Sequence, residues 1–198
     1  VVILGAGLDA RAVRLAGELG GVTVFEVDHP ATQAYKRDAL ARVGASSPAR
    51  YVAWNFERDP LERLADALAA VGHDRATPTF TVWEGVTMYL TRAAIESTLA
   101  AVRDYGPVGS ELVLNYVDRA RAEGRGPASR VVGRVVRGVG EPFVSGFEHA
   151  EMASLLERAG FAVSRNASLS VWAKALLPVR WGDRVGLGGN LAVARRTA

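Results

Sequence analysis

The first feature of the sequence that could do chemistry is a glycine turn, Gly5-Ala6-Gly7, which directly follows a short apolar run. Glycines let a ligand approach the backbone closely, and a helix that starts after such a turn points its partly positive N-terminus at the ligand. Asp9 and Arg11 place opposite charges beside this turn. Asp9 would repel a pyrophosphate but would attract the ammonium group of an amino acid. The turn therefore favours a ligand that carries an amino acid.

Three more polar side chains lie at or just after the ends of predicted strands. Asp28 ends a β-branched run, Asn55 lies at the end of a run rich in aromatic residues, and Glu84 follows a run that ends in Trp83. The carboxyl ends of parallel strands meet at one edge of the sheet, where ligands bind. A carboxylate can accept hydrogen bonds from both hydroxyls of a ribose, and an amide can pair with adenine. Together with the glycine turn, these side chains predict a nucleoside site.

Two nucleoside ligands fit this pattern. Gly5-x-Gly7-x-x-Ala10 matches the G-x-G-x-x-G/A turn of dinucleotide-binding proteins, and Glu26 and Asp28 lie near the expected position of their ribose-binding acid. S-adenosylmethionine fits as well, because it joins an adenosine to an amino acid, as the charges beside the turn require. The chain also ends in two predicted strands after one helix, whereas a dinucleotide fold would end in a second strand-helix repeat. An NAD(P)-dependent oxidoreductase remains the alternative.

The segments that must position these side chains alternate between strand-like and helix-like patterns. This alternation predicts a single α/β, Rossmann-like domain over residues 1–198, with a mostly parallel sheet that helices cover on both faces. Residues 118–147 break the alternation and are expected to form an insertion or cap. The predicted strands are 1–4, 22–28, 51–56, 78–83, 109–117, 162–167 and 190–195. The predicted helices are 10–19, 30–43, one that begins at 59–62 with Asp59 as its N-cap, one capped by Thr91, and one that Gly160 ends.

Composition excludes several classes of protein. The sequence has no cysteine, so disulfides, thiolate metal sites and cysteine nucleophiles are ruled out, and no metal site is expected. No apolar run approaches the roughly 20 residues of a membrane span, so we expect no membrane partner and a cytoplasmic location.

The net charge is +3, and one arginine cluster stands out. It lacks interleaved aromatic residues, so we expect a solvated face and no nucleic-acid partner. The cluster comprises Arg119, Arg121, Arg125, Arg130, Arg134 and Arg137.

Three motifs resemble those of the leucine carboxyl methyltransferase family. They are residues 4–11 (LGAGLDAR), 25–30 (FEVDHP) and 83–90 (WEGVTMYL), and they occur in the family's order at the predicted strand ends. The resemblance is specific across residues 1–117. It implies a class I S-adenosylmethionine-dependent methyltransferase fold, with seven strands of which the last is antiparallel.

The resemblance also implies roles for individual residues. Asp28 would hold the ribose, and Asn55 and Phe56 would contact adenine, where the family more often has an acidic-apolar pair. Glu84 would lie beside the amino end of the methionine part, and Tyr89 would face the methyl group and the acceptor as the candidate catalytic residue. The residues implied to line the methionine part of the cofactor are Gly5, Ala6, Gly7, Asp9 and Arg11. Family members carry lid helices ahead of the first strand, and because this sequence starts on the strand, an open site is expected.

The implied activity is O-methylation of a carboxylate or hydroxyl on a small molecule such as a polyketide-type metabolite. A carboxylate is ionised at neutral pH and needs no general base, whereas a hydroxyl needs one. His29 and His149 are the candidate bases, although capping or surface roles explain them equally well. A non-catalytic relic that lost its lid is a further alternative, and a homodimer is possible.

Overall fold

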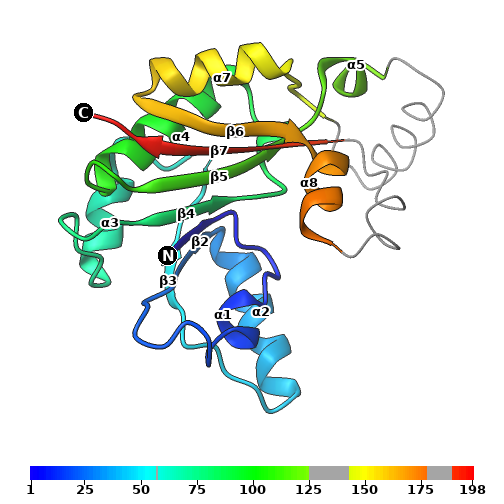
Figure 1. Cartoon of the computed structure of the whole chain (residues 1–198). Helices are drawn as coiled ribbons and strands as arrows, with labels where there is room; N and C mark the ends of the chain where they lie inside the picture. Colours follow the sequence, from blue (N-terminus) through cyan, green and yellow to red (C-terminus); the bar gives the residue numbers. More distant parts are fainter. Residues whose placement is uncertain (57, 125–142, 178–188) are drawn as a thin grey trace.

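The computed structural model describes residues 1–56, 58–124, 143–177 and 189–198. A seven-stranded sheet with the strand order β3-β2-β1-β4-β5-β7-β6 forms its centre (Figure 1). The first five strands are parallel, and β7 runs antiparallel to both of its neighbours. This topology confirms the predicted fold class and the antiparallel last strand. The strands are β1 (Val2–Leu4), β2 (Phe25–Asp28), β3 (Arg50–Ala53), β4 (Phe80–Trp83), β5 (Glu111–Tyr116), β6 (Phe161–Ser168) and β7 (Asn190–Arg196).

Helices cover both faces of the sheet, because alternate residues of a strand point to opposite sides. Val2 and Leu4 of β1 belong to the main core, which α3, α4 and α7 complete. Ile3 belongs to a smaller cluster that contains Ala12 of α1. The helices are α1 (Arg11–Arg14), α2 (Pro30–Arg42), α3 (Leu64–Ala70), α4 (Arg92–Tyr105), α5 (Arg119–Ala122), α7 (His149–Arg158) and α8 (Leu169–Leu176), with short 3-10 helices η1 (Leu61–Arg63) and η2 (Thr87–Tyr89).

Local signals set several helix ends as predicted. The hydroxyl of Thr91 accepts a hydrogen bond from the backbone N–H of Ala94 (3.2 Å) and caps α4. Gly44, with φ of 69°, follows the last residues of α2, where the left-handed conformation favours glycine. The prediction that Asp59 caps a helix is wrong: its carboxylate accepts from the N–H of Asn55 (2.7 Å). Asp59 therefore holds a residue of the candidate site.

Two helix predictions need correction. The helix expected over 10–19 is limited to α1, because residues 14–18 are exposed and the predicted apolar face has no core to pack against. Conversely, α8 lies in a segment where no helix is predicted. This short helix is amphipathic, with Ser170 and Lys174 four residues apart on one side, so its pattern was present in the sequence and was missed; Ala173 is its one buried residue.

The region 118–147 is described only in part. It contains α5 and the extended segment 143–147, and the remainder, residues 125–142, lies outside the described residues. The predicted arginine cluster therefore falls mostly outside them, with Arg119 and Arg121 as its described members. Within the described part of the chain, no helix is long and apolar enough to cross a bilayer.

Candidate functional site

The glycine turn lies at the carboxyl end of β1 and bends the chain beside two neighbouring strands. Gly5 and Gly7 have φ of 63° and 47°, a region that side chains disfavour. The N–H groups of Gly5 and Ala6 both donate to the carbonyl of Val27 in β2 (2.9 and 3.2 Å). On the other side, a Cβ added to Gly5 would lie 2.3 Å from Cγ2 of Val86. The turn thus needs glycine for its conformation and for the approach of Val86.

Asp28 joins the end of β2 to the glycine turn. One carboxylate oxygen accepts from the N–H of Gly7 (2.5 Å), and the other accepts from the N–H of His29 (2.6 Å). Each carboxylate oxygen can accept more than one hydrogen bond, so both retain capacity for an external hydroxyl. The side chain is half-buried and rigidly oriented. It is therefore able to accept from two adjacent hydroxyl groups.

An open cleft of about 630 Å³ extends from Asp28 toward the end of β3. It brings together Asp28, Asn55 and Phe56, as the sequence predicted, and it includes Tyr89. We call it the nucleoside cleft. Sequence reasoning assigned no role to several of its lining residues, although three of them lie inside the motif 83–90, because their types carry no distinctive chemistry. The missed residues are Trp54, Arg58, Gly85, Val86 and Leu90.

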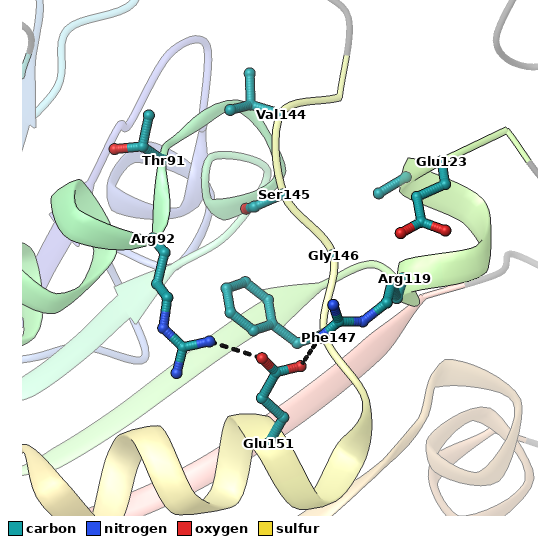
Figure 2. A pocket seen from close by; sticks show the side chains of 10 residues that line it. Thr91, Arg92, Arg119, Glu123, Val144, Ser145, Gly146, Phe147 and Glu151 are labelled. Atoms are coloured by element: carbon teal, nitrogen blue, oxygen red, sulfur yellow. Dashed lines mark hydrogen bonds and ion pairs between the residues drawn. The ribbon is translucent and has the colours of Figure 1, made fainter.

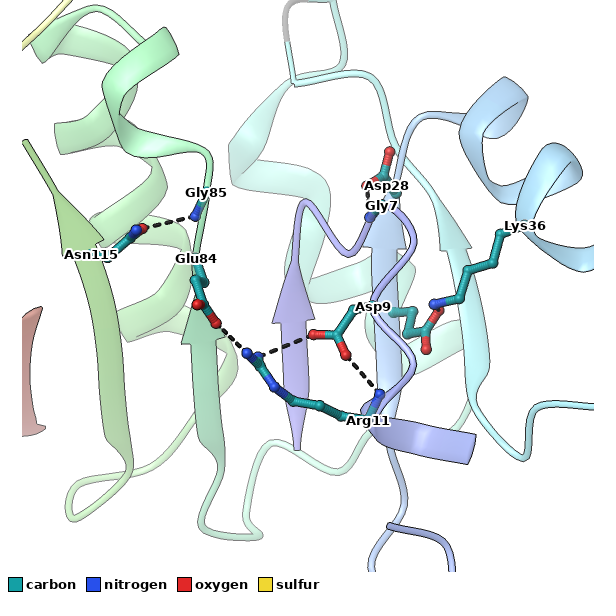
Figure 3. Close-up of polar contacts among 9 residues, drawn as sticks. Gly7, Asp9, Arg11, Asp28, Lys36, Glu84, Gly85 and Asn115 are labelled. Carbon is teal, nitrogen blue, oxygen red and sulfur yellow. Dashed lines mark hydrogen bonds and ion pairs between the residues drawn. The ribbon is translucent and has the colours of Figure 1, made fainter. Parts of the chain in front are cut away.

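A second open cleft, of about 350 Å³, shares Gly5 with the first and is lined by four charged residues, Asp9, Arg11, Arg14 and Glu84, of which Figure 3 labels all but Arg14. Arg11 makes an ion pair with Asp9, Nη1 to Oδ2, at 3.0 Å, and another with Glu84 at the end of β4. Burial opposes the charge of Arg11, but Glu84 and Asp9 outweigh it and raise the pKa of the guanidinium. This charged cleft presents both signs of charge within one small volume.

A side chain from β5 fixes the loop that carries Glu84. The amide oxygen of Asn115 accepts from the N–H of Gly85 (2.8 Å), and the backbone carbonyl of Asn115 accepts from the hydroxyl of Thr87 (2.5 Å). The loop is therefore held on one side by β5 and on the other by the contact between Val86 and the glycine turn.

Glu26, considered above as a ribose-binding acid, does not reach either cleft lining. Its residue is 1% exposed, and its carboxylate pairs with Nζ of Lys36 from α2 at 2.5 Å. Burial raises the pKa of Glu26, and Lys36 opposes that rise. Glu26 and Lys36 thus form a buried pair beneath the site, and Asp28 is the acid that β2 presents to a ligand.

Tyr89 is partly exposed, and its ring packs 5.9 Å from that of Phe143. The segment that follows Phe143 lies on η2: the N–H groups of Val144 and Ser145 donate to the carbonyl of Met88 (2.8 and 3.2 Å). The hydroxyl of Ser145 donates to the carbonyl of Thr87 (3.1 Å). Residues 143–147 therefore form a wall behind Tyr89.

Beyond this wall lies a third open pocket, of about 410 Å³, which the sequence did not predict (Figure 2). Glu151 of α7 lies between two arginines, with an ion pair to Arg92 of α4 at 2.7 Å and another to Arg119 of α5. Burial opposes ionisation of Glu151, but both arginines outweigh it and lower its pKa. We call these three side chains the Glu151 clasp. They come from three helices, so no local spacing could have revealed them.

Comparison with known proteins shows the family of this chain. Residues 1–103 match the model of the family described as leucine carboxyl methyltransferase. The chain belongs to this family. A protein of Bacillus subtilis, provisionally named an S-adenosyl-L-methionine-dependent methyltransferase, is 33% identical over 175 residues, which are 84% of this chain and 55% of that protein. One of Streptomyces coelicolor with the same provisional naming is 37% identical over 123 residues, 62% of this chain and 42% of that protein.

Solved structures agree in fold. The mitomycin 7-O-methyltransferase has a TM-score of 0.63 at 15% identity, covering 99% of this chain and 48% of that one. This chain therefore spans about half the length of the relatives it matches. The family match covers the glycine turn, Asp28, Asn55 and Glu84, and of the Glu151 clasp it includes Arg92 but neither Arg119 nor Glu151.

Proposed function

We propose that this protein binds S-adenosylmethionine and transfers its methyl group to an oxygen atom of a small molecule. One observation carries the proposal: the nucleoside cleft and the charged cleft meet at Gly5. The first offers a carboxylate and an aromatic residue, as a nucleoside requires. The second offers both signs of charge, as a zwitterionic amino acid requires. S-adenosylmethionine joins these two chemical parts in one molecule.

Different residues of the chain fit the nucleoside part and the amino-acid part of the cofactor. Asp28 accepts hydrogen bonds from the ribose hydroxyls, and Asn55 and Phe56 border the adenine. In the charged cleft, Arg11 binds the carboxylate of the amino acid, and Glu84 and Asp9 bind its ammonium group. The bound cofactor supplies a methyl group on a positively charged sulfur. The protein's contribution is to align the acceptor with that methyl group and to limit the access of water.

Two observations disfavour the dinucleotide alternative. The helix after the glycine turn, α1, has only four residues, so it offers little dipole to a pyrophosphate. The carboxylate of Asp9 lines the charged cleft where that pyrophosphate would lie.

Residues 118–147 act in this proposal as a cap on the acceptor side. The contacts of residues 143–147 with Met88 and Thr87 support this role, because they place the segment beside Tyr89. The pocket at the Glu151 clasp is of a size that suits a small molecule.

Calorimetry with S-adenosylhomocysteine tests the proposal. We expect the wild-type protein to bind it and Asp28→Ala to bind at least about 100-fold more weakly, because charge-assisted hydrogen bonds contribute about 1.5–3 kcal/mol each. Asp38→Ala, at an exposed position on α2, is the matched control and should bind as the wild type does. Tighter binding of NAD⁺ would favour the oxidoreductase, and binding of neither ligand would favour a non-catalytic module.

A further inference from the structure

We propose that His149 accepts the proton of a hydroxyl-bearing methyl acceptor, and that Asn190 and Asp118 hold it in the tautomer this requires. The inference rests on the proposed function and narrows its acceptor from a carboxylate or hydroxyl to a hydroxyl, such as a phenol. A chain of hydrogen bonds carries the inference. It lies at the carboxyl end of β5, where Tyr116 pairs with Asn190 at the start of β7.

The direction of each hydrogen bond in this chain follows from its chemistry. The carboxylate of Asp118 can only accept, and it accepts from the amide nitrogen of Asn190 (Nδ2 to Oδ1, 2.6 Å). The amide oxygen of Asn190 must then face His149, whose Nε2 lies 2.9 Å away. Because that oxygen can only accept, Nε2 carries a proton. The neutral imidazole therefore keeps its lone pair on Nδ1.

Nδ1 is available to a ligand. His149 is exposed and is the first residue of α7. Among the described residues, none makes a hydrogen bond to this nitrogen. The neutral ring thus keeps the lone pair of Nδ1 available for a proton, while the hydrogen bond of Nε2 to Asn190 holds the ring in place.

Buried groups support this exposed side chain. Asn190 is 1% exposed. The amide nitrogen of Asn166 donates to the carbonyl of His149 (2.9 Å), and the hydroxyl of Tyr116 donates to the amide oxygen of Asn166 (2.6 Å). The ring of Tyr116 also packs edge-on against His149, with 6.3 Å between centroids. Burial raises the pKa of Tyr116 to about 12, although its hydrogen bond to Asn166 opposes the rise, so the phenol stays a donor at neutral pH. A surface histidine that only begins a helix needs no such support.

The position along the sheet edge matches the proposed role. The nucleoside cleft lies over β2 and β3, and the charged cleft lies at β1 and β4. The next strands along are β5 and β7; Asp118 lies two residues beyond the end of β5, and Asn190 is the first residue of β7. Residues 144–147 bridge the two regions, because Val144 bonds to Met88 and Phe147 bonds to the carbonyl of Val117 (3.0 Å). In this proposal the acceptor lies above β5, between the cofactor and His149.

The proton and electron balance of the step is simple. The acceptor hydroxyl gives its proton to Nδ1, and its oxygen forms a bond to the methyl carbon. The bond between that carbon and sulfur breaks, and its electron pair stays on the sulfur. The amide oxygen of Asn190, itself held by Asp118, accepts the hydrogen bond from Nε2 of the imidazolium that forms. The imidazolium then releases its proton to water.

Nuclear magnetic resonance of the ¹⁵N-labelled protein tests the tautomer directly, since the chain has only three histidines. We expect neutral His149 to carry its proton on Nε2, and Asp118→Ala to convert it to a mixture, because the amide of Asn190 is then free to turn. A wild-type His149 that carries its proton on Nδ1, or a mixture of both tautomers, would overturn the proposal.

A second measurement tests proton transfer with 4-nitrophenol, whose absorbance reports its ionisation. In the presence of S-adenosylhomocysteine and below the phenol's own pKa, we expect the wild-type protein to increase the nitrophenolate signal and His149→Gln to lose that increase. Glu157→Gln, exposed on the same helix, is the control and should retain it. An absent increase, or an equal one in His149→Gln, would overturn the role of His149. Failure of the wild type to bind S-adenosylhomocysteine would instead contradict the proposed function, and His149→Gln should bind it normally.

Discussion

The two halves of the candidate site are built in different ways. On the cofactor side, the polar groups lie within a few residues of a strand end, and backbone N–H groups hold the central carboxylate of Asp28. On the acceptor side, the groups meet only through side chains from distant segments: Asn190 and Asp118 are 72 residues apart, and Asn190 and His149 are 41 apart. Local backbone geometry fixes the first half, whereas strand pairing and helix packing between distant segments fix the second. Substitutions should therefore affect the two halves differently.

The largest effect is expected from Lys36→Met, below the cofactor side. Removing one partner of a buried ion pair leaves an uncompensated charge, which costs about 3–5 kcal/mol in the free energy of unfolding. Without Lys36, the pKa of Glu26 in the folded state lies further above its unfolded value, so stability is lost as pH rises through that pKa and recovers as pH falls. Urea denaturation at several pH values measures this.

The double variant Glu26→Leu with Lys36→Met is the control for that prediction. It removes both charges, so it should recover much of the lost stability and lose the pH dependence. A single variant Lys36→Met as stable as the wild type at neutral pH would contradict the importance of the pair to the cofactor side.

A smaller loss is expected from Gly5→Ala, at the junction of the two clefts. The left-handed conformation costs a side chain about 1–2 kcal/mol, and the overlap with Val86 adds to it. We expect destabilisation of about 2 kcal/mol or more by urea denaturation, together with weaker binding of S-adenosylhomocysteine. Adding Val86→Ala should restore only the steric part. Gly17→Ala, with no atom within 4 Å of its added Cβ, is the matched control and should be nearly neutral.

The smallest effect is expected from Glu151→Gln, on the acceptor side. Both arginines of the Glu151 clasp are substantially exposed, so the midpoint of urea denaturation should shift only slightly, and less at high salt. The two arginines lower the pKa of Glu151 in the folded state. The ion pairs therefore contribute to the free energy of unfolding at neutral pH, and this contribution is lost as pH falls through that pKa. Affinity for S-adenosylhomocysteine should not change. A loss of affinity as large as that of Asp28→Ala would show that the two halves are not separable.

Much of the cofactor side was predictable because its signals are local. A glycine turn after an apolar run, an acid at the end of a β-branched run and a threonine cap each involve residues close in sequence, and the structure has all three at their predicted positions. The errors arose where packing outweighed the local pattern. The helix over 10–19 lacked a core to cover, and Asp59 bonded to Asn55 instead of capping a helix.

The sequence by itself determined the mostly parallel sheet, the glycine turn and the strand-end positions of Asp28, Asn55 and Glu84. Hydrophobic periodicity, turn chemistry and the alternation of strands and helices along the chain can all be read from residues that are close in sequence. Only the tertiary structure shows how differently Glu26 and Asp28 are placed, although they are two residues apart in one strand: Lys36 of α2 pairs with the first, while the second lies where the strand ends and lines a cleft. Likewise, only the pairing of β5 with β7 brings Asn190 to Asp118 and His149. The energy of a buried polar contact depends on what covers it, and that information is spread over the whole fold.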